Sequence, residues 1–260
     1  MIAFLGDGTR KMLGLQKNTN NELTVYWASA IPPQHGNWTM LYSEPKNLYK
    51  MLMDQRNPER EINNYLLCPA ASGDFKKTFV TSFPHDASYK YNFENGNQEI
   101  FPTSKEYINF NIKRNPTVLQ GPTVEFSMAY SFFCEEDLVA RFTPPMFHQP
   151  KHTRYATVIP GSFNIGSWFR PYPLEMQLWN NSGEIIFEEN EPLFYVTFET
   201  DRPIKLKRFV FTEEIYALQT HCIKYYSQEY SLTKRYNTFK KSDMHKLVLH
   251  EIKKNLIDKD

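Results

Sequence analysis

Trp168, Phe169 and Arg170 place two aromatic rings and a guanidinium side by side, in a segment flanked by Gly166 and Pro171. Aromatic faces stack on flat ligands, and a guanidinium pairs with carboxylates and phosphates through a fork of N–H donors. The segment therefore predicts a site for a flat ligand that carries an anionic group. The alternative is that the rings cap the hydrophobic core and that Arg170 pairs with a carboxylate of the protein.

His148 and His152 are a second candidate, because residues four apart share one face of a helix and two imidazoles there can bind zinc or iron. Pro150 lies between them and disfavours a helix. The Glu that follows the first His in zinc peptidases is absent. We expect neither a metal nor another cofactor, and we interpret the two histidines as loop residues near the ligand site.

Several common catalytic motifs are missing from the sequence. It contains no Gly-x-x-x-x-Gly-Lys-Ser/Thr, no Gly-x-Gly-x-x-Gly and no Gly-x-Ser-x-Gly, which disfavours phosphate-loop and α/β-hydrolase chemistry. Glu175, Glu188, Glu189 and Glu191 are potential acids or bases. Most of them should lie on the solvated face of strands.

The elements that position these residues are mainly strands. Residues 174–178 alternate apolar and polar side chains, residues 180–183 form a turn signal, and three further strand patterns follow at 184–188, 193–199 and 204–211. We interpret this run as a β-meander. Other expected strands are residues 23–28, 78–82, 88–93, 106–112 and 123–134, with a hairpin turn at 94–97.

Helical spacing appears at both ends of the chain. Ser43 looks like the N-cap of a helix that ends near residue 55, and residues 212–228 and 242–256 have apolar residues at helical spacing. Residues 57–66 fit a second short helix, but residues 65–68 could equally form a strand. The basic run 234–241 is interpreted as a linker, and residues 31–36 as a loop.

These patterns predict an α+β protein that is mainly β. We expect one β-rich domain over residues 1–240 with its core at 75–211, an N-terminal α/β elaboration, and an amphipathic C-terminal helix over residues 241–260.

The amino-acid composition disfavours several classes of protein. Thirty Lys and Arg balance 29 Asp and Glu, so nucleic acid is an unlikely partner, although the basic C-terminal helix could contact nucleic acid or a protein. No apolar run approaches the roughly 20 residues that span a bilayer, and the N-terminus does not resemble a signal peptide. Three widely spaced cysteines argue against a disulfide framework. We expect a soluble cytoplasmic protein that does not bind membranes.

Residues 157–199 resemble the superfamily of dCTP deaminases and dUTPases, whose fold is a β-clip. The resemblance rests on elements in the same order, Val158-Ile-Pro-Gly-Ser-Phe163, Gly166-Ser-Trp168, Leu174-Glu175, Asn180, Ile185-Ile-Phe187 and the strand 193–198. It implies a β-clip-like barrel or sandwich core, a homo-oligomer, specifically a trimer, and a catalytic role for Glu175. Ile159 replaces the Asp that precedes Pro-Gly in that family, so the resemblance implies the fold more than the turnover.

The whole chain also resembles a group of proteins from marine tailed phages, chiefly through residues 68–70 and 160–163. Our leading hypothesis is a protein that binds a small ligand or nucleotide in a cleft near Trp168 and Arg170, without dUTPase or deaminase turnover; in a viral context it would act in the host cytoplasm. One alternative is a phage structural or host-interaction protein. Another is a nucleotide deaminase or pyrophosphatase that uses Glu175.

Overall fold

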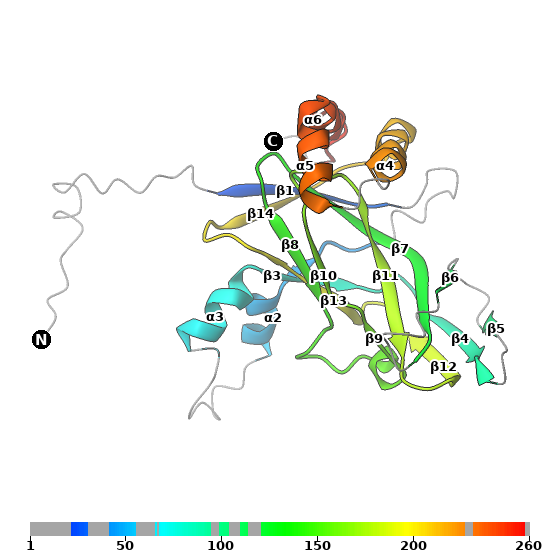
Figure 1. Cartoon of the computed structure of the whole chain (residues 1–260). Helices are drawn as coiled ribbons and strands as arrows, with labels where there is room; N and C mark the ends of the chain where they lie inside the picture. The colour runs from blue at the N-terminus through cyan, green and yellow to red at the C-terminus, as the bar shows by residue number, and fades with distance from the viewer. Residues whose placement is uncertain are drawn as a thin grey trace, which may run out of the picture.

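The computed structural model of the chain describes residues 22–30, 42–55, 66, 68–94, 99–103, 110–113, 121–226 and 231–257 (Figure 1). It confirms a mixed α+β protein that is mainly β. The predictions for residues 31–36 and 57–65, for most of the turn at 94–97 and for residues 106–109 of the strand expected at 106–112 lie outside the described residues.

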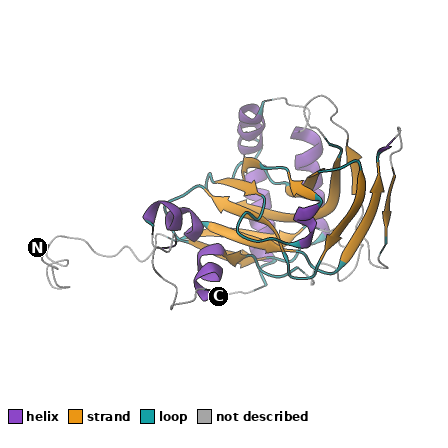
Figure 2. Cartoon of the chain, turned by 90° about the horizontal axis from the view of Figure 1, so that it is seen from below, coloured by secondary structure: helices purple, strands orange, loops and turns teal. Residues whose placement is uncertain are grey.

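Three sheets make up the core, and Figure 2 shows their strands as curved layers through the middle of the molecule. The largest sheet has the order β14-β1-β7-β11-β9, with β6 also paired to β7. Its strands are β14 (Ile204–Arg208), β1 (Leu23–Ser29), β7 (Thr123–Cys134), β11 (Pro171–Leu178), β9 (Ala156–Val158) and β6 (Phe110–Lys113). Only β1 and β14 pair in parallel among the described strands.

The two other sheets complete the layers. The five-stranded sheet contains β10 (Gly161–Asn164), β8 (Val139–Thr143), β13 (Pro192–Phe198), β3 (Thr78–Ser82) and β2 (Lys46–Asn47), in that order. The three-stranded sheet contains β12 (Ser182–Phe187), β4 (Ala87–Asn92) and β5 (Glu99–Pro102), in that order. All three sheets are open within the described residues, so the core is a layered sandwich rather than a closed barrel.

Aromatic side chains fill the space between the layers. Phe142 on β8 stacks on Tyr172 of β11, with ring centroids 3.7 Å apart, which joins the two larger sheets. Phe126 on β7 packs edge-on against Phe187 of β12 at 5.4 Å and joins the third sheet. Because strand side chains alternate between faces, β7 can pack on both sides of its sheet. The high aromatic content of the sequence is therefore largely core packing.

The helices lie outside the sheets. Figure 1 shows α4 (Glu213–Tyr226), α5 (Leu232–Lys241) and α6 (Met244–Lys254) together on one side, and α2 (Leu48–Asp54) and α3 (Pro69–Lys76) on another. Phe133 of β7 contacts Phe239 of α5 at 6.5 Å, so the C-terminal helices pack on the outer face of the largest sheet. None of the helices in the described part of the chain is long and apolar enough to cross a membrane.

The structure corrects the β-meander. The strands β11, β12, β13 and β14 follow one another in the chain, but they belong to the largest, the three-stranded, the five-stranded and again the largest sheet. Alternation of apolar and polar residues identifies a strand without identifying its neighbour. Strand β13 is buried along nearly its whole length because it lies inside the five-stranded sheet between β8 and β3.

Two other local predictions are corrected, and one helix was missed. Residues 234–241 are not a linker, because they lie within α5. The first N-terminal helix starts after Asn47, whose side-chain oxygen accepts from the Lys50 N–H at 3.1 Å, rather than at Ser43. Helix α3 was not predicted at all. By contrast, β3, β7, α4 and α6 lie where the patterns predicted them.

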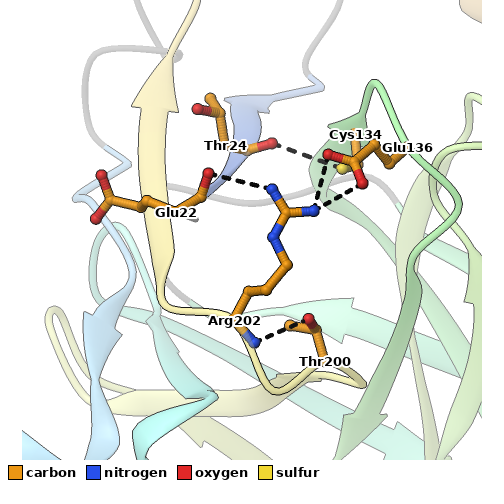
Figure 3. A network of polar contacts seen from close by, with 6 residues as sticks. All are labelled: Glu22, Thr24, Cys134, Glu136, Thr200 and Arg202. Atoms are coloured by element: carbon orange, nitrogen blue, oxygen red, sulfur yellow. Dashed lines mark hydrogen bonds and ion pairs between the residues drawn. The ribbon is translucent and has the colours of Figure 1, made fainter. Parts of the chain in front are cut away.

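The acidic turn between β7 and β8 holds several elements together. Arg202 donates to the two carboxylate oxygens of Glu136 at 2.9 and 2.7 Å and to the Glu22 carbonyl at 3.4 Å (Figure 3). Lys253 of α6 donates to Glu135 at 2.9 Å, and Lys240 of α5 pairs with Asp137. The turn thus connects the start of β1, the loop before β14 and the helices α5 and α6.

Candidate ligand-binding pocket

A pocket of about 270 Å³ lies where three elements meet. They are the turn that connects β9 to β10, the beginning of β11 and the first turns of α5. The volume is slightly below the range of roughly 300 to 1,000 Å³ for small-molecule sites, so it suits a compact ligand or one end of a longer molecule.

The β9–β10 turn forms one wall and is fastened to β11. The Ile159 N–H donates to the Glu175 carbonyl oxygen at 2.8 Å, and the Tyr172 hydroxyl donates to the Ile159 carbonyl oxygen at 2.7 Å. Pro160 and Gly161 at the tip line the pocket. Since Tyr172 is also stacked on Phe142 in the core, this wall is rigidly supported.

The segment from Asn164 to Trp168 delivers the indole to the pocket. The Asn164 side-chain oxygen accepts from the backbone N–H groups of Leu138 at 3.1 Å and Gly166 at 3.0 Å. A Cβ at Gly166 would lie 1.9 Å from the Glu136 carbonyl oxygen, so only glycine permits this approach.

Two guanidiniums lie over the ring of Trp168. The guanidinium carbon of Arg170 is 4.7 Å from the ring centroid, and that of Arg235 from α5 is 5.1 Å away. The indole itself is only 3% exposed, and its Nε1–H donates to the Cys222 carbonyl oxygen at 3.5 Å. The indole ring therefore makes cation–π interactions with two guanidiniums.

Arg170 is half-buried, and its Nε–H donates to the Pro171 carbonyl oxygen at 3.1 Å. Burial lowers the pKa of its guanidinium, the charge of Glu125 opposes that shift, and the charge of Arg235 adds to it. Arg170 nonetheless keeps its charge at pH 7. Arg170 forms no ion pair with any carboxylate in the described ranges. The alternative in which Arg170 pairs with a carboxylate of the protein therefore has no support among these residues.

Glu175 lines the same pocket from β11, where it is half-buried. Its cross-strand neighbour on β7 is Glu125, so two carboxylates sit opposite each other. Like charges in that position repel, which favours nearby cations. Together, the charged residues that line the pocket are Arg170, Arg235 and Glu175.

Two contacts with β10 and the β7–β8 turn fix the position of α5, and therefore the position of Arg235. The Tyr236 hydroxyl accepts from the Asn164 N–H at 3.0 Å, and Lys240 pairs with Asp137, whose carboxylate also accepts from Ser167 and Asn164. Burial raises the pKa of Asp137, but the hydrogen bonds from Lys240, Ser167 and Asn164 together hold it below its usual value. Helix α5 is thereby tied to the segment that carries Trp168.

The structure brings together only some of the predicted site residues. Trp168, Arg170 and Glu175 line one pocket. Phe169 does not, because its ring is completely buried and packs against Phe133 with centroids 5.6 Å apart. The interpretation of the rings as core caps therefore fits Phe169.

His148 and His152 lie outside this pocket. His148 is on the loop after β8, whereas His152 is not a loop residue but lies in the short 3-10 helix η5 (Lys151–Arg154) that precedes β9. We call the segment that carries both residues the histidine loop. His148 Nδ1 shares a hydrogen bond with the Tyr195 hydroxyl, and burial lowers the pKa of its ring. His152 is 1% exposed and stacks on Phe187 at 5.4 Å, and burial lowers its pKa to about 4. Within the described part of the chain, no group of three or more His, Cys, Asp or Glu side chains is placed to hold a metal ion.

Sequence reasoning missed Arg235, Leu232 and Tyr172 as pocket residues. A signal for Arg235 existed, because Leu232, Tyr236 and Phe239 have helical spacing within the run that was interpreted as a linker. The basic composition of that run obscured it. No protein-family model matches the chain, and a comparison with curated proteins finds no similar sequence.

Proposed function

We propose that this protein binds a small ligand or nucleotide in the pocket formed by the β9–β10 turn, β11 and α5, and that it does so without dUTP hydrolysis or dCTP deamination. The observation that carries the proposal is Arg170. Its guanidinium is half-buried at the pocket and has no carboxylate in ion-pair contact among the described residues. A desolvated charge of this kind is costly unless a ligand supplies the counter-charge.

Isothermal titration with a panel of deoxynucleosides and deoxynucleotides tests the proposal. We expect saturable heat for at least one member and a loss of roughly tenfold or more in affinity for Arg170→Ala. Arg141→Ala is the matched control, because Arg141 is exposed on β8 and lies outside the pocket. Absence of heat across the panel, or equal affinity in Arg170→Ala, would contradict the proposal.

A second candidate function is nucleotide hydrolysis or deamination with Glu175 as the acid or base. Support comes from the position of its side chain, in the same pocket as the Pro160–Gly161 turn and Trp168. Direct assays of dCTP deamination and dUTP hydrolysis test it. Full activity in Glu175→Gln would remove the assigned role.

We further propose that residues 157–199 form a β-clip-like core, that the protein comes from a phage or bacterium, that it acts in the cytoplasm, and that it assembles as a homotrimer. None of the three cysteines, Cys68, Cys134 and Cys222, is in a disulfide, which supports a reducing compartment. Sedimentation equilibrium tests the assembly: a monomer at micromolar concentration would contradict the trimer.

A further inference from the structure

The aromatic residues that line the pocket cannot offer an open face to a flat ligand. Trp168 is 3% exposed, and Phe163 and Tyr172 are each 8% exposed. The guanidinium carbon of Arg170 also lies 5.7 Å from the Phe163 ring, so this ring too faces a cation of the protein itself. A base would find no exposed ring on which to stack.

Cations, in contrast, are concentrated at this place. Arg170 and Arg235 both lie over Trp168, and each of them lines the pocket. With Glu175 as the only lining carboxylate among the described residues, the lining has two positive charges and one negative charge. Two guanidiniums that share one ring repel each other, and an anion bound to both would relieve that repulsion.

We propose that the pocket recognises a small phosphate monoester through its phosphate group, held by Arg170 and Arg235, and that the rest of the ligand contributes little. This inference rests on the proposed function and narrows its ligand class. A phosphate monoester carries about 1.5 to 2 negative charges on a single group at pH 7, which matches two adjacent guanidiniums better than the two separated carboxylates of a dicarboxylate do. Arg235 is the residue that determines this specificity, since it adds the second cation from α5.

Glu175 has a defined part in this arrangement. Its carboxylate lines the pocket beside the two cations, so it opposes the entry of additional negative charge. The pocket therefore prefers one phosphate group to a chain of several. Glu175→Gln should raise the affinity for pyrophosphate several-fold more than the affinity for ribose 5-phosphate.

Isothermal titration with four probes tests the inference: deoxyuridine, deoxyuridine 5′-monophosphate, ribose 5-phosphate and succinate. We expect both phosphates to bind with similar affinity and the nucleoside and succinate to give no measurable heat. Arg235→Gln should weaken the binding of both phosphates by roughly tenfold or more. Lys234→Gln is the matched control, since this neighbour on α5 is exposed and outside the pocket, and it should change affinity by about twofold at most.

The contradicting outcomes separate this inference from the proposed function. Deoxyuridine that binds as tightly as its monophosphate would overturn the phosphate assignment and leave ligand binding intact. Equal binding of succinate would overturn the preference for phosphate. Circular dichroism of Arg235→Gln shows whether α5 remains folded; a folded variant with unchanged phosphate affinity would remove Arg235 from the site.

Discussion

The Arg170 pocket and the histidine loop place nitrogen-containing side chains beside aromatic rings, and burial acts on both in the same direction. It lowers the pKa of His152 to about 4, so this imidazole is neutral at pH 7. It also lowers the pKa of Arg170, but a guanidinium cannot lose its proton in a protein. His152 is therefore neutral inside the protein, whereas the pocket keeps the two positive charges of Arg170 and Arg235.

The difference shows why similar residue types lead to different roles. A buried group that can give up its proton removes the cost of its own burial. A guanidinium cannot lose its proton, so its charge is compensated by aromatic rings, by a counter-charge from the protein or by a ligand. Arg170 lies over the ring of Trp168 and has no ion pair with a described carboxylate, so we propose a ligand as its counter-charge and a packing role for His152.

The largest expected effect comes from removing the indole ring of Trp168, which lies under the two guanidiniums. Trp168→Ala should lower the free energy of unfolding by about 3 to 5 kcal/mol, because the indole is buried and its loss leaves a cavity. It should also abolish phosphate binding. Chemical denaturation and titration measure the two effects.

Trp179→Ala is the matched control for this prediction. Trp179 is 50% exposed, and its Nε1–H donates to the Thr153 carbonyl oxygen at 3.1 Å. Its removal should cost about 1 kcal/mol and leave the affinity unchanged. Equal losses of stability in the two tryptophan variants would contradict the assignment of Trp168 to the buried support of the pocket.

The second prediction concerns His152, the buried imidazole that is neutral at pH 7. The folded pKa of His152 lies below its usual value of 6.5, so the unfolded chain takes up a proton first as the pH falls. Stability is therefore complete above pH 6.5 and declines between pH 6.5 and 4, by about 3 kcal/mol from this group alone. Denaturant unfolding at half-unit pH intervals measures the slope.

His152→Phe should flatten that slope, because phenylalanine keeps the stack on Phe187 and does not titrate. His250→Gln is the control, since His250 is exposed on α6 and should leave the slope unchanged. A slope that persists in His152→Phe would show that another group causes the loss of stability in acid.

The smallest expected effect tests how α5 is held at the pocket. Lys240→Ala removes an exposed ion pair with Asp137, so it should cost less than about 1 kcal/mol of stability. It should weaken phosphate binding by about two- to fivefold, because Arg235 is then less firmly positioned. Lys241→Ala, a neighbouring exposed lysine, should change neither quantity. An unchanged affinity in Lys240→Ala would mean that Tyr236 alone is sufficient to position the helix.

Local patterns predicted much of the secondary structure. Strand β7 and helix α6 follow their periods of about two and 3.6 residues closely, because each buries one well-defined set of side chains. Sheet order was not predictable in this way. The partners of β11, β12 and β13 depend on contacts between segments far apart in the chain, and no single segment encodes them.

The sequence predicted only some of the residues that line the pocket. Trp168, Arg170 and Glu175 lie within one short stretch of sequence, where their types are conspicuous. Arg235 comes from a helix about 60 residues later, and only the docking of α5 through Tyr236 and Lys240 brings it to Trp168. The expected stacking of a flat ligand on these rings does not fit the pocket, because the rings are buried. The sequence alone did not show that burial.

A crystal structure of the protein with ribose 5-phosphate tests the central claim most directly. We predict the phosphate group within hydrogen-bond distance, about 3 Å, of both the Arg170 and the Arg235 guanidinium nitrogens, with the sugar directed toward the opening of the pocket. The loop with His148 and His152 should be unchanged. A phosphate bound at the histidine loop, or at any place where it contacts neither arginine, would contradict the account.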